Sequence, residues 1–480
     1  MVALRGQGRS STTQSRRCLI AAAIALAFGA SAPAQADMET LLDTLRQKGV
    51  LSEEEYQEMR KDVRAERRAQ ALEKANQAEK DAKRAESAPT ELTGRFKDGF
   101  SWSTGDGQNA IAVTGRVHAD YRTFSNDSTN ANAADTFDIR RAYIGLQGKI
   151  AGDWTFDVTG DFGALSANSH LDVAWINYGG YRQAQFRAGQ FKMPMSVEEL
   201  TSSRFIDFQE RSMVNAFVPG KERGAMLHGE PVTGLYYAVA ASNGAGKNTN
   251  EGDATVDDKD YIARLAVNAA EMIGNKDMVL HAGGSFAHGN LVANQSPVGG
   301  GIRTEGRGMT FFQTANVGAA GQTMDRTRSQ LEASLAWNNV KLQGEWITTN
   351  YETQAASRDI EVYYAEAMWL ITGEKYADAY RSSAYSAIKP NRAFKRGADG
   401  WGAWEVGVRY TSFDAGDFVA NAGFTNKADA VTVGLKWIPN TNTRVMLNYV
   451  DTSFDTPVAI AGGRTTEDEQ AITMRLALYF

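Results

Sequence analysis

The sequence lacks the features on which many enzymes and helical membrane proteins depend. Cys18 is the only cysteine, so the rest of the chain offers no disulfide and no thiolate nucleophile. Only five histidines occur, and no two of them have the spacing of a metal site. No run of about 18 apolar residues exists, which excludes a helical membrane protein, and no glycine-rich phosphate loop precedes a helix. We therefore expect no cofactor, no metal ion and no nucleic-acid partner.

Residues 1–36 have the form of a secretory signal peptide. Four arginines precede a short apolar run over 19–28, and Ala34 and Ala36 supply small residues for cleavage. The apolar run has about half of the ~20 residues that a spanning helix needs. Because Cys18 lies in this segment, we expect the mature chain to contain no cysteine.

Residues 37–88 are dense in Ala, Glu, Lys and Arg and have helical spacing. Ser52 and Glu55 form a capping box that begins a second helix, which is polar all round beyond Leu72. Because such a helix is not stable alone, we favour a coiled coil within an oligomer; a loosely ordered arm is the alternative. We place this helical arm in the periplasm and assign 89–95 to a linker.

From residue 96 to the end, apolar and polar residues alternate with the period of β-strands. Leu331, Leu335 and Trp337, for example, alternate with polar residues. The apolar faces often end in an aromatic residue, as in the girdles of membrane barrels, and we count about sixteen strands. Short joins alternate with long polar stretches over 123–135, 243–257, 290–325 and 373–400. The pattern predicts an all-β fold, a transmembrane antiparallel β-barrel over 96–480. A secreted all-β protein is the alternative, but it leaves the aromatic ends unexplained.

The last residues, Ile472 to Phe480, alternate strictly and end on an aromatic side chain. A terminal Phe resembles the signal that outer-membrane barrels present to their assembly machinery. We therefore expect that machinery and outer-membrane lipid to be partners of this chain.

Three segments resemble the phosphate-selective porin O and P family. They are GRVHADY at 115–121, FDIRRAYIGL at 137–146, and GQFKMP at 189–194, followed by EELTSSR at 198–204 and FQERS at 208–212. The resemblance implies a sixteen-stranded barrel, usually trimeric, with an inward loop near 194–222 that narrows the pore. It also implies that a helical extension such as 37–88 forms a trimeric stalk in the periplasm.

The strand phase places more basic than acidic side chains inside the barrel, although the net charge is −6. The candidate pore-lining cations are Arg116, Arg140, Arg141, Arg187, Lys192, Arg204, Arg264, Arg328, Lys341, Arg409, Lys436, Arg444 and Arg475. The inward acids are Asp120, Asp157, Asp161, Glu332, Glu345, Glu366 and Glu405. Fixed cations in a pore favour anions, and arginine matches the geometry of phosphate.

We therefore expect an outer-membrane porin for the passive diffusion of small anions, with phosphate or a related oxyanion as the best match. Two alternatives stay open. If the arginines pair with the inward acids, the pore would be a weakly selective general diffusion porin. A barrel-borne hydrolase using His118 is the third reading and the weakest, because no histidine lies in a recognisable Ser or acid motif. We expect no enzyme activity.

Overall fold

The computed structural model divides into two compact units, residues 1–91 and residues 92–480. The described residues are 46–48, 52–57, 60–61, 72, 75–76, 91–96, 99–126, 133–163, 170–246, 248, 258–292, 296–319, 322–397 and 399–480. The signal peptide expected over 1–36 lies outside them, and so does most of the arm expected over 37–88.

The described part of the first unit includes the start of a helix at residue 53. The predicted capping box is confirmed. The Glu55 N–H donates to Ser52 Oγ (3.3 Å), and the Ser52 N–H donates to Glu55 Oε2 (3.0 Å). Tyr56 is buried beneath the guanidinium group of Arg46, 4.6 Å from its ring centroid. Among the described residues, no helix is both long and apolar enough to cross a membrane.

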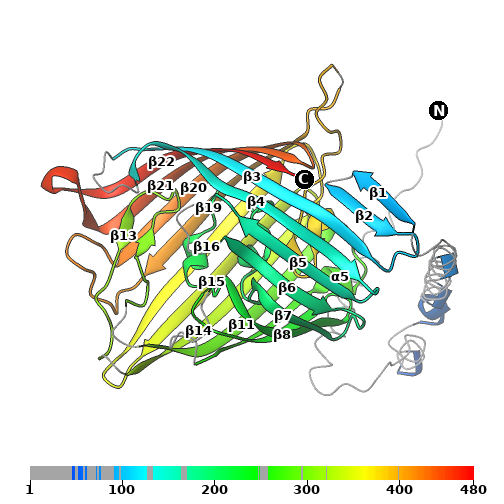
Figure 1. The fold of residues 1–480 in the computed structure, drawn as a ribbon, viewed down its shortest axis with the longest axis horizontal. Helices are drawn as coiled ribbons and strands as arrows, with labels where there is room; N and C mark the ends of the chain where they lie inside the picture. The colour runs from blue at the N-terminus through cyan, green and yellow to red at the C-terminus, as the bar shows by residue number, and fades with distance from the viewer. Residues whose placement is uncertain are drawn as a thin grey trace, which may run out of the picture. The chain divides into compact units, whose positions relative to one another are not determined.

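The second unit is a closed antiparallel β-barrel of sixteen strands, and the predicted fold class is confirmed. The barrel strands are β3 (Ala110–Phe124), β4 (Thr136–Ile150), β5 (Trp154–Asp161), β6 (Leu171–Tyr178), β7 (Gln185–Lys192), β8 (Lys221–Val232), β9 (Leu235–Ser242), β10 (Asp260–Asn268), β11 (Met278–Val292), β14 (Thr323–Trp337), β15 (Val340–Glu352), β16 (Ser357–Leu370), β19 (Ala403–Asp414), β20 (Lys427–Asn440), β21 (Thr443–Ile460) and β22 (Arg464–Tyr479). Each strand pairs with the next, and β22 pairs with β3 to close the barrel (Figure 1).

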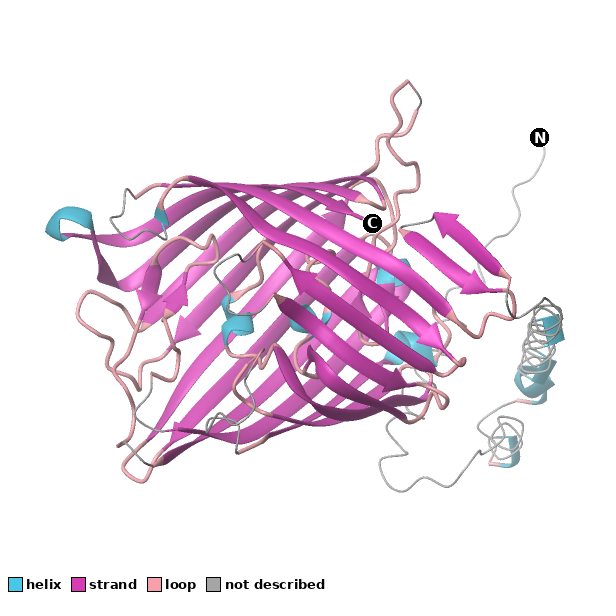
Figure 2. Cartoon of the chain, viewed as in Figure 1, coloured by secondary structure: helices cyan, strands magenta, loops and turns pink. Residues whose placement is uncertain are grey.

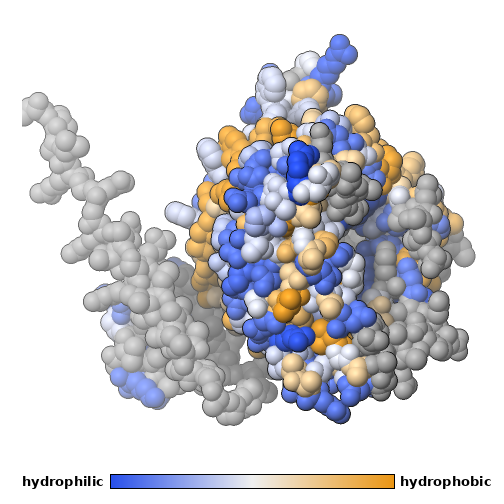
Figure 3. All heavy atoms as spheres, turned by 90° about the vertical axis from the view of Figure 1, so that its left-hand side faces the viewer, coloured by the Kyte–Doolittle hydropathy of each residue, from blue (hydrophilic) through white to orange (hydrophobic). Residues whose placement is uncertain are grey.

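Alternation along the strands separates an apolar outer surface from a polar interior. In β14, Leu331 faces outward with 60% of its surface exposed, whereas Glu332 faces inward with 4% exposed. Figure 3 looks onto one end of the barrel, where hydrophilic residues cover much of the face and hydrophobic residues gather along parts of its rim. The period-two pattern of the sequence is therefore the pattern of a wall that is apolar outside and polar inside.

The barrel closes at Phe480. The Gly115 N–H donates to the Phe480 carbonyl (2.7 Å), and the Phe480 N–H donates to the Gly115 carbonyl (3.1 Å). The Phe480 ring lies directly on Gly115, where a Cβ atom would stand 2.2 Å from the ring. Glycine is therefore required at position 115, because any side chain there would displace the terminal ring.

A short hairpin extends the sheet beyond the point where β22 ends. It consists of β1 (Leu92–Phe96) and β2 (Phe100–Thr104), and β2 pairs with the start of β3. The assignment of 89–95 to a linker is therefore corrected for 92–95. The three-residue alternation of Leu92, Gly94 and Phe96 is too short to be recognised as a strand before its partner is known.

The two ends of the barrel differ in the length of their connections. At the end that holds the C-terminus, two-residue turns join β8 to β9, β14 to β15 and β20 to β21 (Figure 1). The short helix α5 (Ala269–Met272) lies in the turn between β10 and β11, and the 3₁₀ helix η5 (Ala461–Gly463) lies in the connection between β21 and β22 at the other end. The long stretch 371–402 is an exception: it connects β16 to β19 at the short-turn end.

Two long connections fold into the barrel from the long-loop end. The connection 193–220 contains α4 (Val197–Leu200) and the 3₁₀ helix η2 (Met213–Ala216), which contacts β15, β16 and β19. The connection 293–322 contains the strand pair β12 (Ile302–Arg303) and β13 (Thr310–Phe312). One apolar cluster holds both against the wall; it includes Met193, Met195, Val197, Phe217, Phe311, Phe312 and Phe413.

A third segment folds inward from the short-turn end. It contains the 3₁₀ helix η4 (Tyr376–Ala379) and the strand pair β17 (Tyr380–Arg381) and β18 (Ala384–Tyr385). The Tyr385 N–H donates to Thr201 Oγ1 (3.2 Å), so the segments from the two ends meet inside the barrel. Figure 2 shows how little helix accompanies the strands.

Candidate functional site

A cavity of about 650 Å³, the main cavity, lies between the wall from β3 to β10 and the connection 193–220. Basic side chains outnumber acidic ones in its lining. The basic residues are Arg116, Arg141, Arg182, Arg187, Lys192, Arg204, Arg211, Lys221 and Arg264. The acidic residues are Asp157, Asp172, Glu199 and Glu230. The cavity therefore carries an excess of positive charge inside an acidic protein.

A second cavity of about 280 Å³, the outer cavity, lies toward the long-loop end. It is lined by Arg140, Arg303 and Arg307 and shares Arg141 and Arg211 with the main cavity. The two cavities therefore meet at these two arginines and follow one side of the lumen.

A β-bulge turns two consecutive arginines toward the lumen. In the pairing of β3 with β4, His118 faces Arg141 and the next residue, Ala119, faces Ile139, which leaves Arg140 as the extra residue. Strict alternation would send one of the two side chains to the lipid. The bulge lets Arg140 line the outer cavity while Arg141 lines both.

Four guanidinium groups of the main cavity form no ion pair with any described residue: those of Arg116, Arg141, Arg187 and Arg204. Arg116 donates to Ser203 Oγ (2.6 Å) and lies 3.9 Å from the ring centroid of Tyr143. Arg187 lies 4.3 Å from the ring centroid of Trp175. Aromatic faces stabilise a guanidinium group without neutralising it, so these charges remain available to a solute.

Glu199 holds two further cations in place. Its carboxylate lies 3.2 Å from Arg211 and 3.6 Å from Lys192, whose ammonium group also donates to the Thr201 carbonyl (3.0 Å). Burial alone would raise the pKa of Glu199, but Arg211 and Lys192 outweigh it and lower the pKa to about 2. Glu199 is therefore ionised at neutral pH, and its negative charge offsets part of the positive charge of Lys192 and Arg211.

The profile of the family described as phosphate-selective porin O and P matches residues 111–480. The chain belongs to this family. A curated relative, Porin O of Pseudomonas aeruginosa, is 25% identical over 80% of this chain and 92% of its own length. The homologues in this porin family are channels. The expectation of an outer-membrane porin for anions is confirmed at the level of the family.

The barrel is similar to a solved anion-selective porin from Comamonas acidovorans. The TM-score is 0.51 and the identity 13%, and the match covers 78% of this chain and all of that one. At this identity the likeness supports the porin fold, whereas the selectivity of this porin depends on its own residues.

Most of the other candidate cations of this porin lie in ion pairs. The pairs are Arg140 with Glu210, Arg264 with Glu332, Arg328 with Asp260, Lys341 with Asp207, Lys436 with Glu405, and Arg475 with Asp120. Arg264 also lines the main cavity, and Arg140 lines the outer one. The structure thus divides the candidates into free and paired cations, which strand phase alone could not do.

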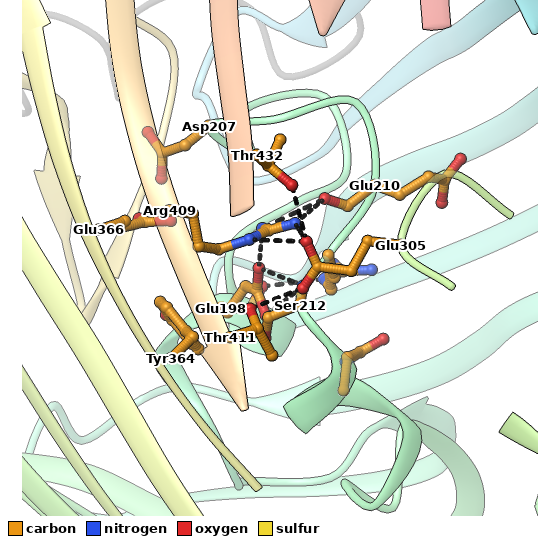
Figure 4. A network of polar contacts seen from close by, with 12 residues as sticks. Glu198, Asp207, Glu210, Ser212, Glu305, Tyr364, Glu366, Arg409, Thr411 and Thr432 are labelled. Atoms are coloured by element: carbon orange, nitrogen blue, oxygen red, sulfur yellow. Dashed lines mark hydrogen bonds and ion pairs between the residues drawn. The ribbon is translucent and has the colours of Figure 1, made fainter. Parts of the chain in front are cut away.

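Arg409 is the centre of a network that joins the wall to both inward connections from the long-loop end (Figure 4). It pairs with Glu305 (2.6 Å) and Glu198 (3.2 Å), one from each connection that folds inward from the long-loop end. Thr411 and Thr432 also donate to Glu305 (2.7 and 2.9 Å). Arg409 therefore fastens both inward connections to the wall.

Arg444 lies apart from both cavities. Its guanidinium carbon is 4.9 Å from the ring centroid of Phe205 and 5.1 Å from that of Tyr479. It forms no ion pair with a described residue, and its side chain is 2% exposed.

Five cavity-lining cations are absent from the candidates drawn from the sequence: Arg182, Arg211, Lys221, Arg303 and Arg307. Arg182 lies in the turn between β6 and β7, and the other four lie in or beside the inward connections. The sequence does contain one signal that the second connection folds inward. Phe311 and Phe312 are adjacent aromatic residues in a polar loop, which indicates that the loop packs against the barrel.

Proposed function

We propose that this porin passes small oxyanions such as phosphate through the outer and main cavities. The carrying observation is that Arg116, Arg141, Arg187 and Arg204 line the main cavity without a carboxylate partner among the described residues. A fixed positive charge in a low-dielectric passage lowers the energy of an anion and raises that of a cation. The planar guanidinium group also offers phosphate paired hydrogen bonds.

The reversal potential in a salt gradient across a planar bilayer tests the selectivity. The full porin should prefer chloride to potassium. A preference for potassium would refute anion passage.

Inhibition of the chloride current by phosphate tests the choice of solute. Arg141→Gln should weaken that inhibition, because Arg141 lies where the two cavities meet. Lys375→Gln is the matched control, since Lys375 is an exposed cation paired with Asp277 (2.6 Å). A chloride current that phosphate leaves unchanged would reduce the function to general anion passage.

A weakly selective general diffusion porin is the second candidate function. The ion pairs of Arg264, Arg328, Lys341, Arg409, Lys436 and Arg475 favour it, because paired charges fill a lumen without selecting a sign. Equal permeability to chloride and potassium would favour this reading. We propose no catalytic role.

We further propose that the porin works as a homotrimer with the 37–88 arm in the periplasm, after removal of 1–36. The capping box at Ser52 supports a helix in the arm, and the strand ending in Phe480 supports recognition by the barrel assembly machinery. Cross-linking through cysteines placed in 37–88 should give trimers. A monomer in mild detergent would contradict the proposal.

A further inference from the structure

Asp157 differs from the other acidic residues that line the main cavity. Among the described residues, no cation forms an ion pair with Asp157. The other three acids of the lining each lie beside a cation. Their ion pairs are Asp172 with Lys221, Glu230 with Arg182, and Glu199 with Arg211. The main cavity therefore contains an unpaired carboxylate as well as unpaired guanidinium groups.

The carboxylate of Asp157 is held in place by two neighbours on the barrel wall. Gln147 Nε2 donates to its Oδ2 (2.8 Å), and the Thr159 hydroxyl donates to its Oδ1 (2.6 Å). Both hydrogen bonds orient the carboxylate and favour its ionised form. Since an ionised carboxylate has about four acceptor positions, about two remain for a solute.

Two of the unpaired guanidinium groups lie near this carboxylate. Arg187 and Arg204 are close enough to Asp157 for their charges to interact, although no ion pair joins them. Trp175 is the cross-strand neighbour of Asp157, and the Arg187 guanidinium lies 4.3 Å from the centroid of its ring. No described residue accepts a hydrogen bond from the guanidinium group of Arg187 or Arg204. The cavity thus presents N–H donors and a carboxylate acceptor near one another but not in contact.

An unpaired carboxylate in an anion passage repels every anion by its charge. It can also attract one, if the anion donates a hydrogen bond to it, because an ionised carboxylate accepts such bonds and donates none. A solute that satisfies both kinds of group needs charged oxygens for the arginines and a hydroxyl group for Asp157. Phosphate has both at neutral pH, as hydrogen phosphate and dihydrogen phosphate, whereas sulfate has no hydroxyl group.

We propose that Asp157 makes this porin select oxyanions that carry a hydroxyl group over oxyanions that carry none. Arg187 and Arg204 bind the charged oxygens of the solute, and Asp157 accepts a hydrogen bond from its hydroxyl group. Sulfate would bring only acceptor oxygens to the carboxylate and is therefore disfavoured. This inference rests on the proposed passage of oxyanions and names the class that passes best.

Inhibition of the chloride current by phosphate and by sulfate tests the selection in the unsubstituted porin. In planar bilayers at neutral pH, phosphate should inhibit at an about tenfold lower concentration than sulfate, the smallest factor expected of a hydrogen bond to a charged group. Charge alone predicts the reverse order, because sulfate is fully deprotonated and phosphate is not. Arsenate should behave as phosphate does, and selenate as sulfate does. Equal or stronger inhibition by sulfate would overturn the proposal.

Asp157→Asn separates the hydrogen bond from the field of the charge. Sulfate should inhibit this variant more strongly and phosphate less strongly, so the preference for phosphate should fall about tenfold. Glu230→Gln is the matched control, because it also removes a negative charge from the lining of the main cavity. It should shift inhibition by the two anions by the same factor. The same common shift in Asp157→Asn would contradict a role for the hydrogen bond.

Failure of this inference can be told apart from failure of the proposed function. A chloride-selective porin that phosphate and sulfate inhibit equally would retain the passage of oxyanions and exclude only the role of Asp157. A preference for potassium in the reversal potential would refute the proposed function, and this inference with it.

Discussion

Both walls of the lumen carry inward cations but use them differently. On one wall, from β3 to β7, Arg116, Arg141 and Arg187 face the main cavity without a carboxylate partner among the described residues. On the other, from β14 to β22, cations such as Lys341 and Arg409 lie in ion pairs. We call them the free wall and the paired wall.

The difference follows from where the connection 193–220 lies. It packs against the paired wall and brings Glu198 and Asp207 to the cations there, while Glu210 pairs with Arg475 in β22 and Arg140 in β4, where the two walls meet. Burial makes an unpaired charge costly, so a covered cation needs a partner, whereas a cation beside open space is solvated. An inward-facing cation therefore either holds an inward connection by an ion pair or remains available to a solute. Whether the connection 193–220 covers the cation determines which of the two roles it has.

The largest expected effect is a loss of stability when an ion pair of the paired wall is broken. Arg409→Gln leaves Glu198 and Glu305 buried without their counter-charge, which should lower the free energy of unfolding by about 3–5 kcal/mol. Thermal unfolding in detergent measures the loss. Arg187→Gln is the control, because this substitution leaves no carboxylate without its ion-pair partner. Equal destabilisation by the two variants would contradict the division into two walls.

Selectivity should respond in the opposite way. Arg187→Gln removes a free charge from the passage and should lower the chloride-to-potassium permeability ratio about fivefold, the factor given by about 1 kcal/mol of Coulomb energy. Lys436→Gln removes a paired charge outside the main cavity and should change the ratio much less. The reversal potentials of both variants measure this ratio. Equal changes in the two variants would contradict the distinction between the free wall and the paired wall.

Removing the charge of Glu199 should change the chloride-to-potassium permeability ratio by a smaller factor. Glu199→Gln should raise the chloride preference about twofold, as expected from roughly 0.4 kcal/mol for one charge about 10 Å away in water. It should also destabilise the connection, because Lys192 and Arg211 lose their carboxylate. The measurement is again the reversal potential, and an unchanged or reduced preference would argue against an anion passage beside Glu199.

The pH dependence is expected to be the weakest effect. The pKa of Glu199, about 2, lies below its ordinary value of 4.5. Its contribution to stability is thus complete above about pH 4.5 and is lost as the pH falls toward 2. Chloride preference should therefore be constant from pH 7 to pH 5 as far as Glu199 determines it. In the Glu199→Gln variant, the remaining pH dependence belongs to other groups.

The sequence predicted the barrel better than the site. Alternation and the terminal Phe480 gave the fold class and the strand number, because a lipid-facing wall must repeat every second residue. Strand phase also gave the inward direction of Arg116, Arg141, Arg187 and Arg409. It could not predict the bulge that turns Arg140 inward, nor the folding of 376–385 into the barrel.

What the sequence determined by itself is which side chains belong inside, since that depends only on the local period of the chain. What the tertiary structure decided is which of them remain free. Arg187 and Arg409 have the same inward phase, yet one faces a cavity and the other lies under Glu198 and Glu305. Those carboxylates come from connections distant in the chain, and only the packing of these connections against one wall leaves the other wall charged.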